Sequence, residues 1–196
     1  WDREWICLGH HGTIPQPGDY FRVEVNDDPL LVSRGPDGTI GVVSAVCQHR
    51  GHLLGEERGN ARQFVCPYHG WAYGLDGTLL GAPATAPYAT LAELRETHCL
   101  PRLRTEIWNG FIFVNLDGRA RPLAPRLKAF TGALANHRLA DLHALPTDDI
   151  PDNPWNWKWM QENGLEPYHT PVAHRGTHDV APAHQSSFPD WNEDDD

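Results

Sequence analysis

The sequence predicts a mainly β domain over residues 1–117, a small antiparallel sandwich or barrel, followed by the truncated start of an α+β domain over residues 118–196. The first part alternates short apolar runs with turns rich in glycine and proline, a pattern typical of small antiparallel β folds. Beyond Asp117, apolar residues recur at helical spacing instead. This change of pattern places a domain boundary near residue 118. Because the chain does not begin with Met, we expect both of its ends to be cuts within a longer protein.

Short strand-like runs and two helical segments account for most of the chain. Two of the runs flank Pro36-Asp37-Gly38, a turn sequence that predicts a hairpin. A brief helix is expected over 89–95, a longer one within 122–142, and a further strand over 145–150. The apolar face of the longer helix consists of Leu123, Leu127, Phe130 and Leu134. The strands expected in the first domain are residues 5–8, 20–25, 30–34, 39–44, 100–108 and 111–115.

Composition narrows the class of protein. The chain has 196 residues, of which 40% are hydrophobic, so it can bury a core. Its 16 basic and 26 acidic residues give a net charge of −10, which argues against nucleic acid as a partner, because phosphate binding needs clustered basic residues. No apolar run is long enough for a membrane span, and no secretory signal is present. Cys7 and Cys99 are expected to be reduced, buried thiols, as in a cytoplasmic protein.

Two short segments each offer one thiol and one imidazole. The first reads Cys47-Gln-His49 and the second Cys66-Pro-Tyr-His69, with sixteen residues between His49 and Cys66. A Rieske [2Fe–2S] cluster needs this order, because one iron takes two thiolates and the other takes two neutral imidazoles. Zinc is an alternative, although zinc ligands usually come as like pairs. A purely structural set of two buried cysteines and two hydrogen-bonded histidines is the other alternative.

The segment from Cys47 to Tyr73 resembles the Rieske domain of ring-hydroxylating oxygenase α subunits, whose pattern is C-x-H-R-G followed by C-P-Y-H-G-W-x-Y. The similarity continues through 76–79 and 108–115. It implies a mainly β Rieske domain with two cluster-binding loops, ahead of the start of an α+β catalytic domain. The implied cluster ligands are Cys47, His49, Cys66 and His69. It also implies that a proline, Pro83 or Pro87, shields the cluster, although an ordinary surface connection fits nearly as well.

The loops lack three residues that high-potential Rieske proteins carry, namely one extra cysteine in each loop and a serine that donates to a cluster sulfide. The corresponding positions hold His52, Tyr68 and Trp71. Since losing a hydrogen bond to sulfur lowers the reduction potential, we expect a value near the low end of the Rieske range, about −150 mV.

A second motif runs from Asn156 to His174 and resembles the N-W-K…E-N-x-x-E-x-Y-H-x₄-H stretch of the same oxygenases. Non-haem ferrous oxygenases bind iron through two histidines and one carboxylate, and the implied histidines are His169 and His174. Five residues rotate an ideal helix by about 140° net, so both rings can face one point only if the helix is distorted. We expect Pro171 to break the helix between them.

The resemblance gives roles to other residues of this motif. Glu166 is implied to connect the mononuclear iron's histidine to a Rieske histidine of the neighbouring subunit, and Asn163 and Tyr168 to support the iron pocket. Helix packing explains Asn163 and Tyr168 about as well. The third ligand is expected beyond residue 196, because Asp179, Asp190 and the acidic residues 193–196 follow His174 too soon.

The implied function is that of a Rieske non-haem iron oxygenase, a mono- or dioxygenase. It would receive electrons from NAD(P)H through a reductase or ferredoxin, and pass them from the [2Fe–2S] cluster to a mononuclear Fe(II) that activates O₂ to hydroxylate or demethylate a small organic substrate. Such proteins are commonly homotrimers, in some cases with a β subunit. The rival hypothesis is a Rieske ferredoxin that only carries electrons. Residues 118–196 favour the oxygenase, since a carrier needs none of them.

Overall fold

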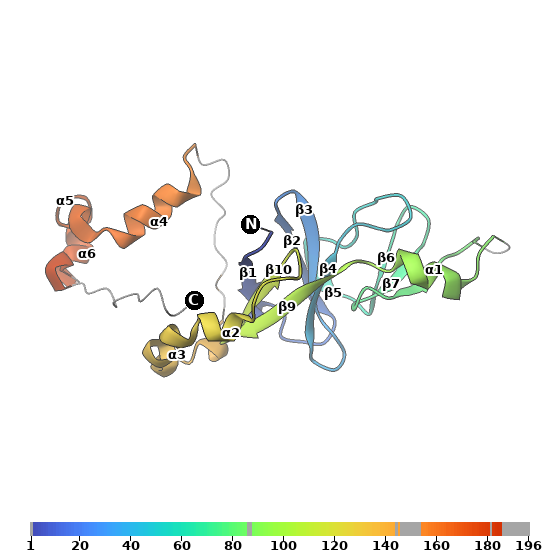
Figure 1. The fold of residues 1–196 in the computed structure, drawn as a ribbon, viewed down its shortest axis with the longest axis horizontal. Helices are drawn as coiled ribbons and strands as arrows, with labels where there is room; N and C mark the ends of the chain where they lie inside the picture. Colours follow the sequence, from blue (N-terminus) through green and yellow to red (C-terminus); the bar gives the residue numbers. More distant parts are fainter. Residues whose placement is uncertain (1, 86–87, 144, 146–153, 181, 186–196) are drawn as a thin grey trace. The chain divides into compact units, whose positions relative to one another are not determined.

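The computed structural model describes residues 2–85, 88–143, 145, 154–180 and 182–185 (Figure 1). The chain divides into two compact units, Trp1–Ala144 and Leu145–Asp196. Pro87 lies outside the described residues. So does the strand expected over 145–150, apart from Leu145. The domain boundary expected near residue 118 stays a prediction about the longer protein.

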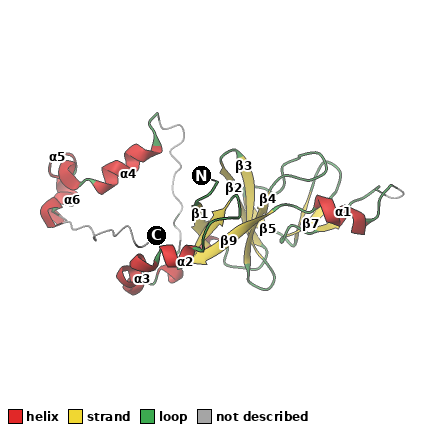
Figure 2. Cartoon of the chain, in the orientation of Figure 1, coloured by secondary structure: helices red, strands yellow, loops and turns green. Residues whose placement is uncertain are grey.

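The first unit is mainly antiparallel β structure, as predicted (Figure 2). One sheet has seven strands in the order β1-β10-β9-β4-β3-β2-β5, and a smaller sheet has the order β6-β7-β8. The strands of the large sheet are β1 (Trp5–His10), β2 (Asp19–Val25), β3 (Asp28–Arg34), β4 (Ile40–Ser44), β5 (Arg58–Asn60), β9 (Arg102–Trp108) and β10 (Phe111–Asn115). Those of the small sheet are β6 (Gln63–Val65), β7 (Ala72–Gly74) and β8 (Leu79–Gly81). All six strands expected from the sequence are present, and β3 and β4 form the predicted hairpin.

Two apolar cores support this unit. One core joins β3 and β4 to the small sheet, and its most buried members include Leu31, Leu54, Tyr73 and Leu79. The other lies among β1, β3, β4 and β10 and includes Val32 and Ile112. The first core also contains Cys47 and Cys66, so the loops that carry these thiols are anchored directly on it.

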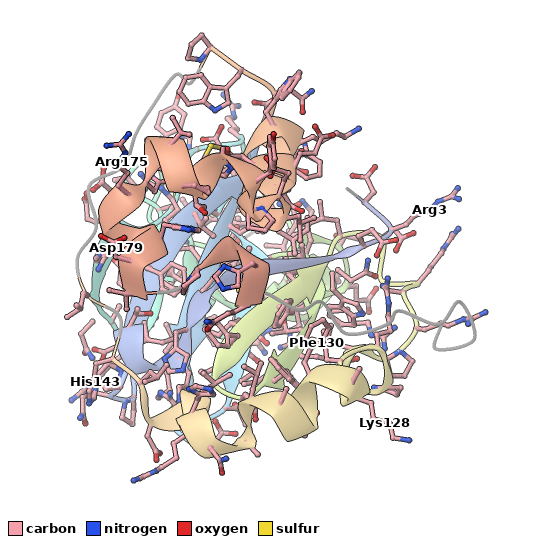
Figure 3. All side chains as sticks on the ribbon, turned by 90° about the vertical axis from the view of Figure 1, so that its left-hand side faces the viewer. Arg3, Lys128, Phe130, His143, Arg175 and Asp179 are labelled. Carbon is pink, nitrogen blue, oxygen red and sulfur yellow. The ribbon has the colours of Figure 1, made fainter. Side chains whose placement is uncertain are left out.

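The helices of the first unit are short. Helix α1 (Leu91–His98) begins at Thr90, whose hydroxyl accepts from the Glu93 backbone N–H while the Glu93 carboxylate accepts from the Thr90 N–H, a capping box that fixes the start predicted for this segment. The single helix expected within 122–142 is instead divided into α2 (Leu123–Arg126), α3 (Lys128–Leu134) and two 3-10 turns, Ala135–His137 and Leu139–Asp141. The α-helix is interrupted at Leu127, whose backbone leaves the helical region. In Figure 3, Lys128 extends from α3 away from the sheet.

Buried polar contacts hold the connector, the segment of residues 116–122 between β10 and α2. The Asn115 amide donates to the backbone oxygens of Asp2 and Glu4 at 3.1 and 3.2 Å, and its oxygen accepts from the Ala120 N–H at 3.1 Å. His10 is also buried, and its Nε2 lies 3.1 Å from the Leu139 oxygen. The turn between β9 and β10 approaches so closely that a Cβ on Gly110, which has φ +87°, would overlap the His10 ring.

The second unit is helical, with α4 (Trp157–Leu165), α5 (Thr170–Ala173) and α6 (Arg175–Val180), and 3-10 turns at Pro167–His169 and Ala183–Gln185. Arg175 and Asp179 lie on one side of α6 (Figure 3). None of the described residues of this unit is buried. Across the described parts of the chain, no helix is long and apolar enough to cross a membrane.

Cysteine burial differs in part from the sequence-based expectation. Cys7 and Cys99 are free thiols, as predicted, but Cys7 is exposed on β1 and Cys99 is half-buried. Cys7 lies beside a β-bulge between Cys7 and Gly9, where the alternation of side chains along the strand is broken.

Candidate metal centres

The two Cys–His loops have the same backbone construction. In the first loop the Cys47 N–H donates to the His52 oxygen and the Gly51 N–H donates to the Cys47 oxygen, both at 2.9 Å. In the second, the Cys66 N–H donates to the Trp71 oxygen at 2.8 Å and the Gly70 N–H to the Cys66 oxygen at 2.9 Å. Both glycines have left-handed φ values, +73° and +72°, which close each loop without the strain that a Cβ would bring. The loops therefore present their ligands as a matched pair.

Thiols and imidazoles occupy different depths. Cys47 and Cys66 are each 2% exposed and belong to the core beneath the loops, whereas His49 and His69 are exposed. The two imidazole rings lie 4.5 Å apart between centroids, at 66° to each other. The site thus has an inner thiol end and an outer imidazole end.

A tyrosine that the sequence did not single out lies against the inner end. Tyr73 follows the second loop on β7 and is 0% exposed. Its hydroxyl oxygen is 3.4 Å from Cys47 Sγ and accepts from the Gln48 N–H at 3.2 Å. Burial and the adjacent Cys47 raise the pKa of Tyr73 well above its ordinary value, so the hydroxyl keeps its proton and can donate to the sulfur.

The second loop is covered by Pro83, one of the two prolines expected to shield the site. Pro83 Cγ is 3.5 Å from the position that a Cβ on Gly70 would take. Trp71, which is buried, stacks on His49.

The arrangement of the four side chains fits a binuclear cluster. A two-iron cluster takes two thiolates on one iron and two imidazoles on the other. Here the two thiols are buried together in the core and the two imidazoles lie next to each other at the surface, so the residues fit the [2Fe–2S] group.

The state of His49 also suits iron. Desolvation, followed by the neighbouring His69 and Arg50, lowers the pKa of His49. The ring is therefore neutral at pH 7, which is the form in which imidazole binds a metal.

In the second unit, the structure brings together Glu166, His169 and His174. The His169 and His174 rings are 5.3 Å apart between centroids, and Glu166 Oε2 lies 3.4 Å from His169 Nδ1. Asn163 lies on exposed α4, and the Tyr168 side chain is 87% exposed. The roles proposed for Asn163 and Tyr168 therefore stay predictions. Asp190 and residues 193–196 lie outside the described part of the chain.

The helix distortion expected in this motif is present, but Pro171 does not cause it. Helix α4 ends at Leu165, and Glu166 has extended backbone, with φ −111° and ψ 104°, directly before Pro167. Pro171 lies in the first turn of α5, where its missing N–H costs no hydrogen bond. The break precedes His169, because a residue that comes before proline is disfavoured in the helical conformation.

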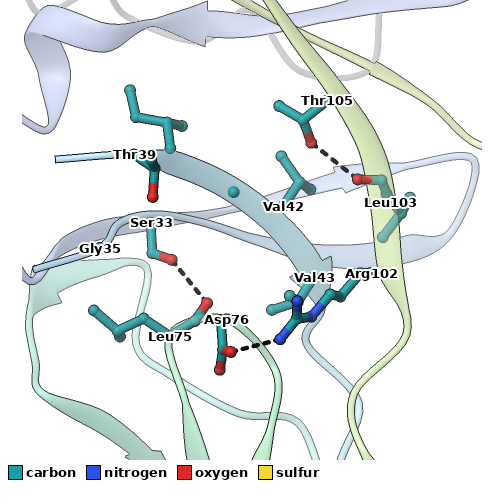
Figure 4. A pocket seen from close by; sticks show the side chains of 12 residues that line it. Ser33, Gly35, Thr39, Val42, Val43, Leu75, Asp76, Arg102, Leu103 and Thr105 are labelled. Carbon is teal, nitrogen blue, oxygen red and sulfur yellow. Dashed lines mark hydrogen bonds and ion pairs between the residues drawn. The ribbon is translucent and has the colours of Figure 1, made fainter. Parts of the chain in front are cut away.

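A hollow between β4 and β9 contains neither set of ligands (Figure 4). Its titratable lining residues are Asp76 and Arg102, and these form an ion pair with each other. We assign no chemistry to it.

Comparison with known proteins agrees with this geometry. Residues 4–100 match the family described as the Rieske [2Fe-2S] domain, and residues 137–194 match the catalytic domain of the ring hydroxylating alpha subunit. The large oxygenase component of salicylate 5-hydroxylase from Ralstonia sp. is 34% identical over 87% of this chain and 43% of its own length. The oxygenase subunit of carnitine monooxygenase from Acinetobacter pittii is 33% identical over 89% of this chain and 47% of its own.

A solved structure gives the same result. The crystal structure of a quaternary ammonium Rieske monooxygenase in complex with L-carnitine superposes with a TM-score of 0.81 and 32% identity, over 91% of this chain and 51% of the other. The chain thus spans less than half the length of the two curated relatives described above.

Proposed function

Since this chain belongs to the α subunits of Rieske-type ring-hydroxylating oxygenases, we propose that it forms the electron-accepting part and the start of the catalytic part of such an enzyme. The observation that carries the proposal is the pair of matched loops, in which two buried thiols lie behind two exposed, adjacent imidazoles. Cys47 and Cys66 would hold the inner iron, and His49 and His69 the outer one. His169 and His174 would hold the mononuclear Fe(II), with a carboxylate from elsewhere in the protein as the third ligand.

When bound, the cluster accepts and releases single electrons and the mononuclear iron activates O₂. The residues of this chain prepare both sites. The Tyr73 hydroxyl can donate to Cys47 Sγ, and the lowered pKa of His49 favours the neutral ring, whose lone pair is free for metal. Glu166 Oε2 approaches Nδ1 of His169, and this contact would leave Nε2 free to hold the iron.

The proposal also covers the electron donor, the substrate, the location and the oligomeric state. The electron donor is a reductase or ferredoxin oxidising NAD(P)H, and the substrate is a small organic molecule. The protein is a cytoplasmic homotrimer in which Glu166 connects the two metal sites of neighbouring subunits. The exposed apolar residues of the second unit support a longer catalytic domain, whose remaining part would bury side chains such as Trp159 and Leu165.

Metal analysis and one variant test the proposal. The full-length protein should contain three irons and two acid-labile sulfides per subunit, with the EPR signal of a reduced Rieske cluster. The His169→Ala variant should lose substrate oxidation while keeping the cluster's EPR signal, because His169 belongs to the other site. His178→Ala is the matched control, since His178 lies on α6 outside the proposed ligand set. A protein without sulfide would refute the cluster, and turnover that survives in His169→Ala would refute the mononuclear site.

The same experiment separates the oxygenase from an electron carrier. A Rieske ferredoxin would contain two irons and would reduce acceptors equally well with or without His169. The match of residues 137–194 to the catalytic domain favours the oxygenase.

A further inference from the structure

His49 lies flat on the indole ring of Trp71. The two ring centroids are 4.7 Å apart and the planes differ by only 4°, a parallel stack. Trp71 follows the second loop, whereas His49 belongs to the first. The contact therefore connects the two loops at the side chains themselves.

Trp71 is buried, whereas His49 is exposed. The indole side chain is 4% exposed, and the Trp71 backbone oxygen accepts the Cys66 N–H. His98 from α1 packs on the indole at 5.5 Å and 59°. His49, in contrast, is exposed, so the face of a buried neighbour is what restricts rotation of its ring.

The other imidazole has a different neighbour. His69 contacts the ring of Tyr68, the preceding residue, at 3.9 Å and 33°. Tyr68 is itself 57% exposed, so it can move with His69. Within the described residues, His49 therefore stacks in parallel on a buried ring, whereas His69, the other proposed imidazole ligand, does not.

We propose that Trp71 is a positioning residue that sets the ring plane of His49 for metal binding. This inference rests on the proposed cluster. The metal-binding lone pair of an imidazole lies in the ring plane, so a rotated ring directs the lone pair away from the iron. A stacked indole restricts this rotation before the metal arrives, as preorganised ligand sites require.

The test compares three variants of the full-length protein. Trp71→Leu removes the flat face, Trp71→Phe keeps one, and Trp108→Leu is the matched control at a tryptophan on β9 outside the site. The readouts are the histidine nitrogen couplings of the reduced cluster by pulsed EPR and the rate at which a chelator removes iron.

Trp71→Leu should change the couplings of one of the two histidine ligands and release iron roughly two- to tenfold faster, the factor associated with one aromatic pair. Trp71→Phe and Trp108→Leu should match the wild type in both readouts. Where Trp71→Leu does not accumulate as folded protein, Trp71→Met, whose flexible side chain fills the space without a ring, carries the same expectation.

Wild-type couplings and release rates in Trp71→Leu would overturn the inference. So would equal changes in Trp71→Leu and Trp71→Phe, or in the Trp108→Leu control. Each of these outcomes presupposes a wild-type protein that contains iron and sulfide. A wild type without them would instead refute the proposed function.

Discussion

Replacing Tyr73 with Phe should lower the reduction potential of the cluster. The change removes one hydroxyl from a fully buried side chain and keeps the ring that fills the core. It therefore deletes the contact with Cys47 Sγ and also the hydrogen bond that the hydroxyl accepts from the Gln48 N–H, while the ring keeps its place in the core. Because the reduced cluster is the more negative state, it gains more from this donor than the oxidised cluster does.

The acceptor sets the expected size of the change. A hydrogen bond to a charged group contributes about 1.5–3 kcal/mol, and we take the lower figure because sulfur is a weak acceptor. For a one-electron couple, about 1.4 kcal/mol corresponds to about 59 mV. If between half and all of about 1.5 kcal/mol distinguishes the two redox states, the potential falls by about 30–60 mV.

The assay is a redox titration followed by the EPR signal of the reduced cluster. Tyr20→Phe is the matched control, because Tyr20 is also a buried tyrosine and its hydroxyl accepts from the Glu56 N–H instead of contacting a ligand. The control should keep the wild-type potential. An unchanged or raised potential in Tyr73→Phe, with full cluster content, would show that the hydroxyl does not donate to the sulfur.

Three further predictions concern the buried contacts of His10, Gly110 and Asn115. Gly110→Ala should lower the free energy of unfolding by at least about 2 kcal/mol, since the new Cβ would overlap His10, whereas Gly41→Ala, whose Cβ would meet nothing within 4 Å, should lose less than about 1 kcal/mol in the same urea titration. Asn115→Leu should cost about 2–4 kcal/mol, because the Glu4 oxygen and the Ala120 N–H lose the Asn115 amide as their partner and the Asp2 oxygen keeps only the Asp117 N–H; a wild-type denaturation midpoint would contradict this. Desolvation and the adjacent His11 lower the pKa of His10, so the unfolded chain binds this proton more readily and stability should fall as pH drops below about 6.5. His10→Gln should flatten that slope, and an equally steep slope in the variant would assign it to other groups.

Features with a local cause were predictable from the sequence. The hairpin of β3 and β4 follows from its turn residues, and a brief helix was expected over 89–95, where α1 begins two residues later, at Leu91. The assignment of the four cluster ligands stays a prediction, and it rests on two loops of fixed spacing that each carry one thiol and one imidazole.

Features that depend on contacts between distant residues were not predictable in the same way. Tyr73 meets Cys47 across 26 positions, and Trp71 meets His49 across 22, contacts that no periodicity indicates. The sequence predicts the helical break of the second motif at Pro171, whereas it lies at Glu166, directly before Pro167. Both prolines lie in the first turn of their own helical segment, so the presence of a proline does not by itself tell which of the two follows the break.

The difference in depth between thiols and imidazoles has a consequence for maturation. Cys47 and Cys66 are buried and His49 and His69 are exposed, so a pre-assembled cluster offered to the folded domain would meet the imidazoles first. Ligand exchange with a delivery protein would then begin at the imidazole end and finish with the thiols.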